Sequence, residues 1–283
     1  MAKPIINCVD DILLKYSIHE DELTKLISGE RFVKAFTQHG GPIVLKLSKI
    51  EGTKIDGYIL NFNKLKNLTH KNIVKHIDIY RLGNFQHPYS IMEVLEYANA
   101  GSILSHLKKF EYEEVIEIFK QVFTGFIFLH KNGILHRDIK LNNILISIIR
   151  NKKIVKIADI ELWPSDDRGI LRTTPEFLAP EVLNYNLYTI QSEIWAIGAM
   201  LYEMFTGKFP FGSRKQGISA EQIRLISKNE EVTGLSDIPI PFQQIITNSL
   251  RRDLAIRVHS VSELRNMLNP ATILYYRLQA VFK

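Results

Sequence analysis

Apolar and polar residues follow two different patterns along the chain. Between residues 14 and 95, short apolar runs of strand length are separated by polar turns, around one stretch with helical spacing. Between residues 102 and 283, most apolar positions recur every three or four residues, which predicts helices. We therefore expect a β-rich N-terminal part and a mainly helical C-terminal part.

The N-terminal part begins with a predicted hairpin. Apolar runs at residues 32–36 and 43–47 flank a turn at residues 39–41, where Gly40 and Gly41 supply the positive φ that such a turn needs. Residues 58–68 have the apolar spacing of a helix. Further strands are predicted over residues 73–80 and 89–95.

The C-terminal part contains the clearest helix, over residues 111–130. Its apolar residues share one face, acids occupy its first turn, and Asn132-Gly133 is a common C-terminal signal. Two short strands are predicted at residues 143–146 and 154–158, joined by a basic hairpin tip. The nearly continuous apolar run at residues 190–205 predicts a helix that is buried on most sides.

Composition excludes several classes of protein. The 283 residues are 46% hydrophobic and 23% charged, with a single cysteine, which allows a sizeable core and no internal disulfide. The net charge of +6 is spread along the chain, so we expect no nucleic-acid partner. No apolar run reaches the roughly 18–20 residues of a membrane span, and the N-terminus lacks the pattern of a signal peptide. A cytoplasmic protein, or one delivered into a host cell, is expected.

One segment, residues 136–145, carries the most chemical information. It places Asp138, Lys140 and Asn143 between apolar runs, and Asp159 ends another apolar run further along the chain. Carboxylate and amide oxygens are ligands suited to Mg²⁺. A second carboxylate beside a lysine is suited to orienting a hydroxyl and neutralising phosphate charge. The pattern favours phosphoryl transfer over a solvated turn.

This segment resembles the catalytic loop of eukaryotic-type protein kinases, H-R-D-x-K-x-x-N. The resemblance continues in order from about residue 25 to residue 268. It includes a lysine strand at residues 44–46, a hinge-like segment at residues 91–93, and an A-P-E motif at residues 179–181. The later Asp253 and Arg257 match the family's D-x-x-x-R, whose arginine usually pairs with the glutamate of A-P-E.

The resemblance implies an α+β, bilobal protein kinase-like fold with a β-rich N-lobe and a mainly helical C-lobe. We expect an N-terminal extension at residues 1–24, the N-lobe at 25–92, the C-lobe at 93–268 and a C-terminal helical tail at 269–283. A cleft is expected near residues 92–96.

The resemblance also implies a role for each matched residue. Asp138 would orient or accept the proton of the attacking hydroxyl, and Lys140 would steady the γ-phosphate. Asn143 and Asp159 would hold Mg²⁺. Contacts to ATP are expected from Lys46 at the α/β-phosphates, from Met92 as the gatekeeper, from the backbone of Glu93 and Leu95 at the adenine, and from Ile27 and Ala35.

The identity of the acceptor and the regulation follow from the same resemblance. Lys140 and Thr174 match serine/threonine kinases, so a protein hydroxyl on Ser or Thr is the expected acceptor. Arg137 before the catalytic aspartate often signals control by activation-loop phosphorylation. Ser165, Thr173 and Thr174 are the candidate regulatory residues.

Three features depart from the family pattern. In the best match to the glycine-rich loop, at residues 27–35, the glycine positions hold Ser28, Glu30 and Val33. Asn61 stands where the family has a helix glutamate, so we expect Lys46 to lack its ion-pair partner. The D-F-G motif reads D-I-E at residues 159–161.

Two main hypotheses remain from the sequence. The first is an active Ser/Thr protein kinase with atypical nucleotide handling, supported by the retained lysine, aspartates and asparagine. The second is a pseudokinase that uses the fold as a binding or scaffolding module, supported by the three departures. A small-molecule kinase is a third, which the A-P-E motif and the late arginine disfavour.

Overall fold

The structure, a computed structural model, describes residues 12, 15–50, 54–82, 89–106, 110–160, 162, 174–269 and 274. The chain divides into two compact units, which are described separately. Unit 1 comprises Met1–Asn99 and Leu162–Arg168, and unit 2 comprises Ala100–Glu161 and Gly169–Lys283. The first boundary therefore follows Asn99 rather than residue 92. Almost all of the predicted tail at 269–283 lies outside the described residues.

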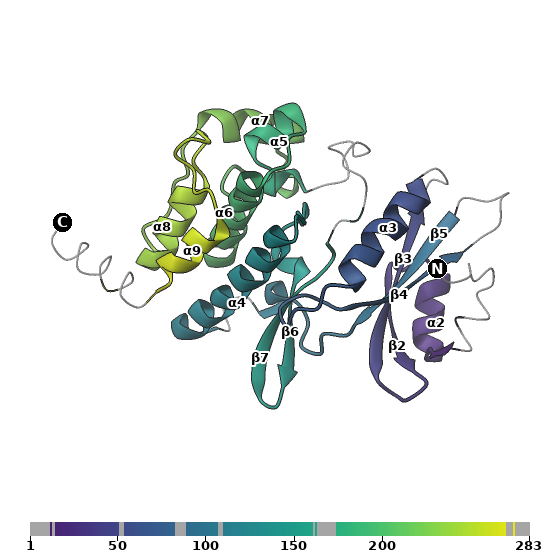
Figure 1. Cartoon of the computed structure of the whole chain (residues 1–283). Coiled ribbons are helices and arrows are strands. Elements are labelled where there is room, and N and C mark those ends of the chain that lie inside the picture. Colours follow the sequence, from purple (N-terminus) through teal and green to yellow (C-terminus); the bar gives the residue numbers. More distant parts are fainter. Residues whose placement is uncertain are drawn as a thin grey trace. The chain divides into compact units, whose positions relative to one another are not determined.

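Unit 1 is built on a five-stranded antiparallel sheet with the order β1-β2-β3-β5-β4. In Figure 1, helices α2 and α3 flank this sheet from opposite sides. The predicted N-terminal hairpin, the two further strands and the predicted helix are present, with ends shifted by a few residues. The elements are β1 (Tyr16–Ser17), α2 (Glu20–Ile27), β2 (Phe32–Thr37), β3 (Pro42–Ile50), α3 (Ile55–Lys66), β4 (His76–Leu82) and β5 (Tyr89–Glu96).

Helix α2 is an element that the sequence pattern did not predict. It connects β1 to β2, which pair over only two residues of each strand. Along the rest of β2, the backbone N–H of Lys34 donates to the carboxylate of Glu22 on α2, with an N···Oε2 distance of 2.9 Å. A side chain on α2 thus satisfies a strand donor that would otherwise have no partner in the sheet. The segment compared with a glycine-rich loop, residues 27–35, is instead the end of a helix, a short turn and a strand.

The two faces of the sheet carry different side chains, because successive residues of a strand alternate and directly opposed residues share a face. One face holds an apolar core that includes Ala35, Leu45 and Met92. The other face carries Lys46, which lies directly opposite Glu93. Helix α3 covers this second face, as the contacts of its buried side chains described below establish.

Unit 2 is mainly helical and surrounds the long buried helix α6, as the apolar run predicted. Helices α8 and α4 pack against α6 and α9 respectively. The helices are η2 (Ile103–His106), α4 (Tyr112–Lys131), η3 (Leu141–Asn143), η6 (Pro175–Phe177), α5 (Pro180–Tyr185), α6 (Ile190–Thr206), η7 (Arg214–Gln216), α7 (Ala220–Asn229), α8 (Ile240–Ser249) and α9 (Val261–Met267). Among the described helices, none has both the length and the apolar character that a membrane crossing requires.

A two-stranded hairpin in unit 2 positions the candidate chemistry. Strands β6 (Ile144–Ile149) and β7 (Lys152–Ile157) pair antiparallel in register from Ile144↔Ile157 onward. The turn between them has positive φ at both Arg150 and Asn151, as a type I′ hairpin turn requires. The start of β6 and the end of β7 therefore lie side by side at the open end of the hairpin.

Candidate active site

The loop before β6 brings three of the predicted site residues together. The Nζ atom of Lys140 lies 2.7 Å from Oδ2 of Asp138. The side-chain amide of Asn143 donates to the same Oδ2 at 3.1 Å and to the backbone carbonyl of Asp138 at 2.8 Å. Both side chains thus fix one oxygen of the carboxylate. Within the described residues, no hydrogen bond is made to the other oxygen, Oδ1.

The open end of the hairpin brings Asn143 close to the second predicted aspartate. The backbone N–H of Ala158 donates to the carbonyl of Asn143 at 2.9 Å, and Asp159 is the next residue. Asp159 has a φ of 57°, a left-handed conformation that aspartate tolerates better than most residues. The strand pairing therefore places Asn143 and Asp159 at one end of the hairpin.

The residues at this end suit a magnesium ion. The amide nitrogen of Asn143 donates hydrogen bonds to Asp138, which leaves its side-chain oxygen to face a metal ion, and Asp159 supplies a carboxylate from the same end of the hairpin. Both are hard oxygen ligands, and Mg²⁺ commonly takes one or two such ligands together with substrate phosphates and water. The described residues contain no cluster of three His, Cys, Asp or Glu side chains placed to hold a metal without such help.

Two buried side chains hold the loop that carries Asp138. His136 is fully buried, accepts from the N–H of Asp138 at Nδ1, and places Nε2 2.9 Å from the carbonyl of Ala158. Glu193 on α6 is 1% exposed and accepts from the backbone N–H of Arg137 at 2.7 Å. Its other oxygen lies 2.7 Å from Nε2 of His130. Glu193 therefore holds the loop through the backbone of Arg137.

In unit 1, Lys46 has an acidic partner, which corrects the expectation of an unpaired lysine. Its Nζ atom lies 2.9 Å from Oε1 of Glu93, and their side chains are 4% and 1% exposed. Asn61 does not take part in this pair; its amide donates to the backbone carbonyl of Leu162 at 2.8 Å.

Several predicted ATP contacts are placed differently by the sheet. Ala35 and Met92 point into the apolar core on the face opposite to Lys46, so they do not share a surface with it. Glu93 and Leu95 lie within β5, between β3 and β4, where backbone groups are used by strand pairing. The prediction that residues 91–93 form the hinge is therefore wrong in position, since β5 continues to Glu96.

The remaining predicted residues divide into described and undescribed ones. Thr174 precedes η6 and lines a small cavity together with Arg137 and Asp138. Ile27 is the last residue of α2, and its side chain lies outside the described part of the chain. Ser165 and Thr173, like Glu161 of the D-I-E sequence, also lie outside the described residues.

A second pocket, of about 510 Å³, opens in unit 2 beside the loop that carries Lys140. Lys140 and Thr174 line it together with Glu176, Glu203 and Lys215. Burial raises the pKa of Glu203 to about 7; the nearby charge of Lys215 lowers it and that of Glu176 raises it. Glu203 therefore titrates near neutral pH.

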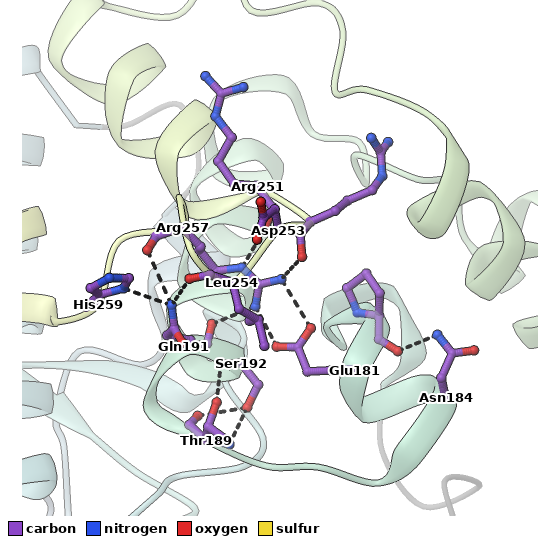
Figure 2. Close-up of polar contacts among 12 residues, drawn as sticks. Glu181, Asn184, Thr189, Gln191, Ser192, Arg251, Asp253, Leu254, Arg257 and His259 are labelled. Carbon is purple, nitrogen blue, oxygen red and sulfur yellow. Dashed lines mark hydrogen bonds and ion pairs between the residues drawn. The ribbon is translucent and has the colours of Figure 1, made fainter.

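The predicted pairing of Arg257 with the glutamate of A-P-E is confirmed. Its Nη1 and Nη2 atoms donate to the two oxygens of Glu181 at 2.5 and 3.1 Å, a bidentate and buried arrangement. The guanidinium also donates to the carbonyls of Gln191 and Arg251 (Figure 2). It lies over the ring of Trp195 as well. This pair joins the first turn of α5 to the loop before α9.

The sequence did not predict that Glu93 pairs with Lys46 or that Tyr58 contacts Glu93. Tyr58 on α3 donates to Oε1 of Glu93 at 2.6 Å. One signal was available: Glu93 is an acid inside an apolar strand, while Lys46 is a base inside the neighbouring one. Burying two opposite charges in neighbouring strands costs free energy unless the two side chains form an ion pair. No pattern singles out Tyr58 from the other aromatic residues of its helix.

Comparison with known proteins identifies the family. A family model, "Protein kinase domain", matches residues 40–267. Mitogen-activated protein kinase kinase kinase 3 of Arabidopsis thaliana is 34% identical over 192 residues, 63% of this chain. Human serine/threonine-protein kinase ULK1 is 32% identical over 67% of the chain, and human myosin light chain kinase family member 4 is 26% identical over 91%. The chain belongs to the protein kinase domain family.

The extent of these matches is informative in two ways. The family match begins at residue 40 and so leaves out α2 and β2. Ser28, Glu30 and Val33, the residues that depart from the glycine-rich pattern, also precede the matched part. The matched part makes up 28% of the Arabidopsis protein, 19% of ULK1 and 68% of the myosin light chain kinase relative.

Proposed function

We propose that this protein is an ATP-dependent kinase that transfers the γ-phosphate to Ser or Thr hydroxyls of a protein. The observation that carries the proposal is the hydrogen bonding of the Asp138 carboxylate. One of its carboxylate oxygens is held by Lys140 and Asn143, which leaves the other to accept the hydrogen bond of a substrate hydroxyl. Thr174 at the edge of the same cavity, and relatives named as serine/threonine kinases, support Ser or Thr as the acceptor.

The reaction exchanges one phosphorus–oxygen bond for another. The hydroxyl oxygen of the substrate bonds to the γ-phosphorus, and the bond from that phosphorus to the β–γ bridging oxygen breaks, so ADP leaves with the electron pair. The hydroxyl proton passes to Asp138 or is oriented by it. Lys140, whose ammonium lies at this carboxylate, is placed to contact the transferred phosphoryl group.

Asn143 and Asp159 are the residues that would hold Mg²⁺. When bound, the ion would neutralise negative charge on the phosphates of ATP. The bond from the Asn143 amide to Asp138 links the proposed metal ligand and the proposed base in one network. A substitution of Asn143 is therefore expected to alter the orientation of the Asp138 carboxylate as well as metal binding.

Nucleotide handling is proposed to be atypical because α2 replaces a hairpin with a glycine-rich tip. Backbone amides of such a tip would normally approach the phosphates, whereas here β1 is followed by helix α2, whose Glu22 accepts a hydrogen bond from β2. Adenine is proposed to bind the backbone of residues 97–99, which follow β5 and are not paired in the sheet. Lys46 remains the proposed ligand of the α/β-phosphates.

The proposal is tested by incubating the protein with Mg²⁺, labelled ATP and a basic acceptor protein, followed by phosphoamino acid analysis. The parent is expected to label Ser or Thr, and Asp138→Asn is expected to lower the rate by about 100-fold or more. Asp237→Asn, an exposed aspartate in the same unit, is the matched control and is expected to retain activity.

A pseudokinase that serves as a binding or scaffolding module is the second candidate, favoured by the presence of α2 in place of the glycine-rich loop. It predicts no labelling above that of Asp138→Asn and no thermal stabilisation by ATP with Mg²⁺. That pair of results contradicts the kinase proposal. Labelling of Tyr alone contradicts the proposed acceptor but not the phosphotransferase activity.

A further inference from the structure

The ion pair of Lys46 is built into the sheet. Lys46 on β3 and Glu93 on β5 are directly opposed, so their side chains leave the sheet on the same face. Their charged atoms are 2.9 Å apart, and both side chains are almost completely buried. A buried pair of this kind loses its hydration, so each charge depends on the other and on nearby hydrogen bonds.

Helix α3 supplies such a hydrogen bond with a neutral group. The hydroxyl of Tyr58, a residue that is 2% exposed, donates to Oε1 of Glu93 at 2.6 Å, the same oxygen that contacts Lys46. The carboxylate is thereby held between strand and helix. Tyr58 adds orientation without adding a charge to the site.

The position on α3 where the family has its glutamate is used for another contact. Asn61 lies one turn after Tyr58 and donates to the carbonyl of Leu162, three residues after Asp159. An acid at position 61 would lack the N–H that this carbonyl accepts. Glu93 therefore pairs with Lys46, and position 61 of α3 instead contacts the segment after Asp159.

We propose that Glu93 is the positioning residue for Lys46, with Tyr58 as its support, and that it replaces the helix glutamate that this chain lacks. This inference rests on the proposed nucleotide-binding function. Because Glu93 belongs to the strand beside the lysine, the pair is set by strand register. The pairing of Lys46 with Glu93 is thus set within the sheet, and α3 contributes through the Tyr58 hydroxyl.

The test measures affinity for ATP, ADP and adenosine by calorimetry, with Mg²⁺ present. Lys46 is proposed to contact phosphates, so Glu93→Gln is expected to weaken ATP and ADP binding by about tenfold or more and to leave adenosine binding unchanged. Tyr58→Phe keeps the ring and is expected to weaken ATP binding by about threefold. Asp78→Asn, which removes another buried and ion-paired carboxylate of the same sheet, is the control and should leave the ATP-to-adenosine ratio unchanged.

A rescue separates positioning from a purely structural role. Asn61→Glu in the parent is expected to give no gain in ATP affinity, because Lys46 already has an acidic partner. The same change in the Glu93→Gln background is expected to recover part of the lost affinity, which gives a non-additive double-mutant cycle.

The outcomes are distinct. Unchanged ATP affinity in Glu93→Gln, or an equal loss for ATP and adenosine, overturns the role of Glu93 while the kinase proposal stands. A parent that binds ATP no better than adenosine and transfers no phosphate overturns both. If Glu93→Gln does not fold, Tyr58→Phe decides: a loss confined to phosphate-bearing ligands supports the role, and no change contradicts it.

Discussion

Glu193 accepts a hydrogen bond from the backbone N–H of Arg137, the residue before the proposed catalytic aspartate. Arg137 has a φ of 65°, in the left-handed region that side chains other than glycine adopt at a cost of about 1–3 kcal/mol. A buried carboxylate on the central helix of unit 2 therefore stabilises a strained backbone. The other oxygen of the same carboxylate lies beside Nε2 of His130.

The first prediction concerns this contact. Glu193→Ala is expected to release the backbone at Arg137 and to lower turnover by about 100-fold, because small misplacements of a reacting group can cost that much. Glu193→Gln retains an acceptor oxygen and is expected to keep most of the activity. The measurement is kcat and KM for ATP. A large change in KM with unchanged kcat contradicts this account.

The second prediction concerns stability. Arg257→Met leaves the buried Glu181 without its bidentate partner and is expected to destabilise unit 2 by about 3–5 kcal/mol. Arg257→Lys keeps the charge but not the paired geometry, so a smaller loss is expected. Urea unfolding measures both. The double variant with Glu181→Leu should be less destabilised than Arg257→Met alone, and an additive loss would contradict the pairing argument.

The third prediction concerns Asp78 in unit 1. Burial alone raises its pKa, but hydrogen bonds from Lys15, Lys66 and Tyr80 lower the pKa to about 2. Because the folded pKa lies below the unfolded value, this stabilisation is complete above about pH 4 and is lost as the pH falls toward 2. It is on the order of 1 kcal/mol, since water screens the partly exposed lysines. Asp78→Asn should remove this acid-sensitive component from unfolding curves measured between pH 2 and 6.

The fourth prediction concerns Glu203, where the sign is opposite. Its pKa is raised to about 7 from the model-compound value of 4.5, so the folded state binds the proton more tightly. Stability is expected to fall as the pH rises from about 4.5 to 7 and to change little above that. Glu203→Gln should abolish this decline in urea midpoints. Glu113→Gln, at an exposed position, should preserve it; equal slopes in both variants would contradict the burial argument.

The sequence predicted what depends on local pattern and chain order. The residues from His136 to Asn143 and the strand to Asp159 lie where the pattern placed them, because a hairpin with a two-residue turn leaves little freedom of register. The partner of Arg257 was also predicted, since the motif itself specifies it.

The remaining features depend on spatial relationships that a single sequence does not contain. Whether Met92 or Glu93 faces Lys46 depends on the register of β3 against β5, and a shift of one residue exchanges the faces. Helix α2 was not predicted, and only its last residue, Ile27, belongs to the segment compared with a glycine-rich loop. Its first-turn acids Glu20, Asp21 and Glu22 were a usable signal for a helix N-terminus.

Helix α2 has a consequence for how this protein behaves in solution. Strand β1 pairs with only two residues of β2. Without α2, the remaining edge of β2 would expose unpaired backbone groups, to which a strand of another molecule could pair. Glu22 occupies one of its donors, and the helix covers that side. Helix α2, which stands in place of a glycine-rich loop, therefore also protects the edge of the sheet against intermolecular strand pairing.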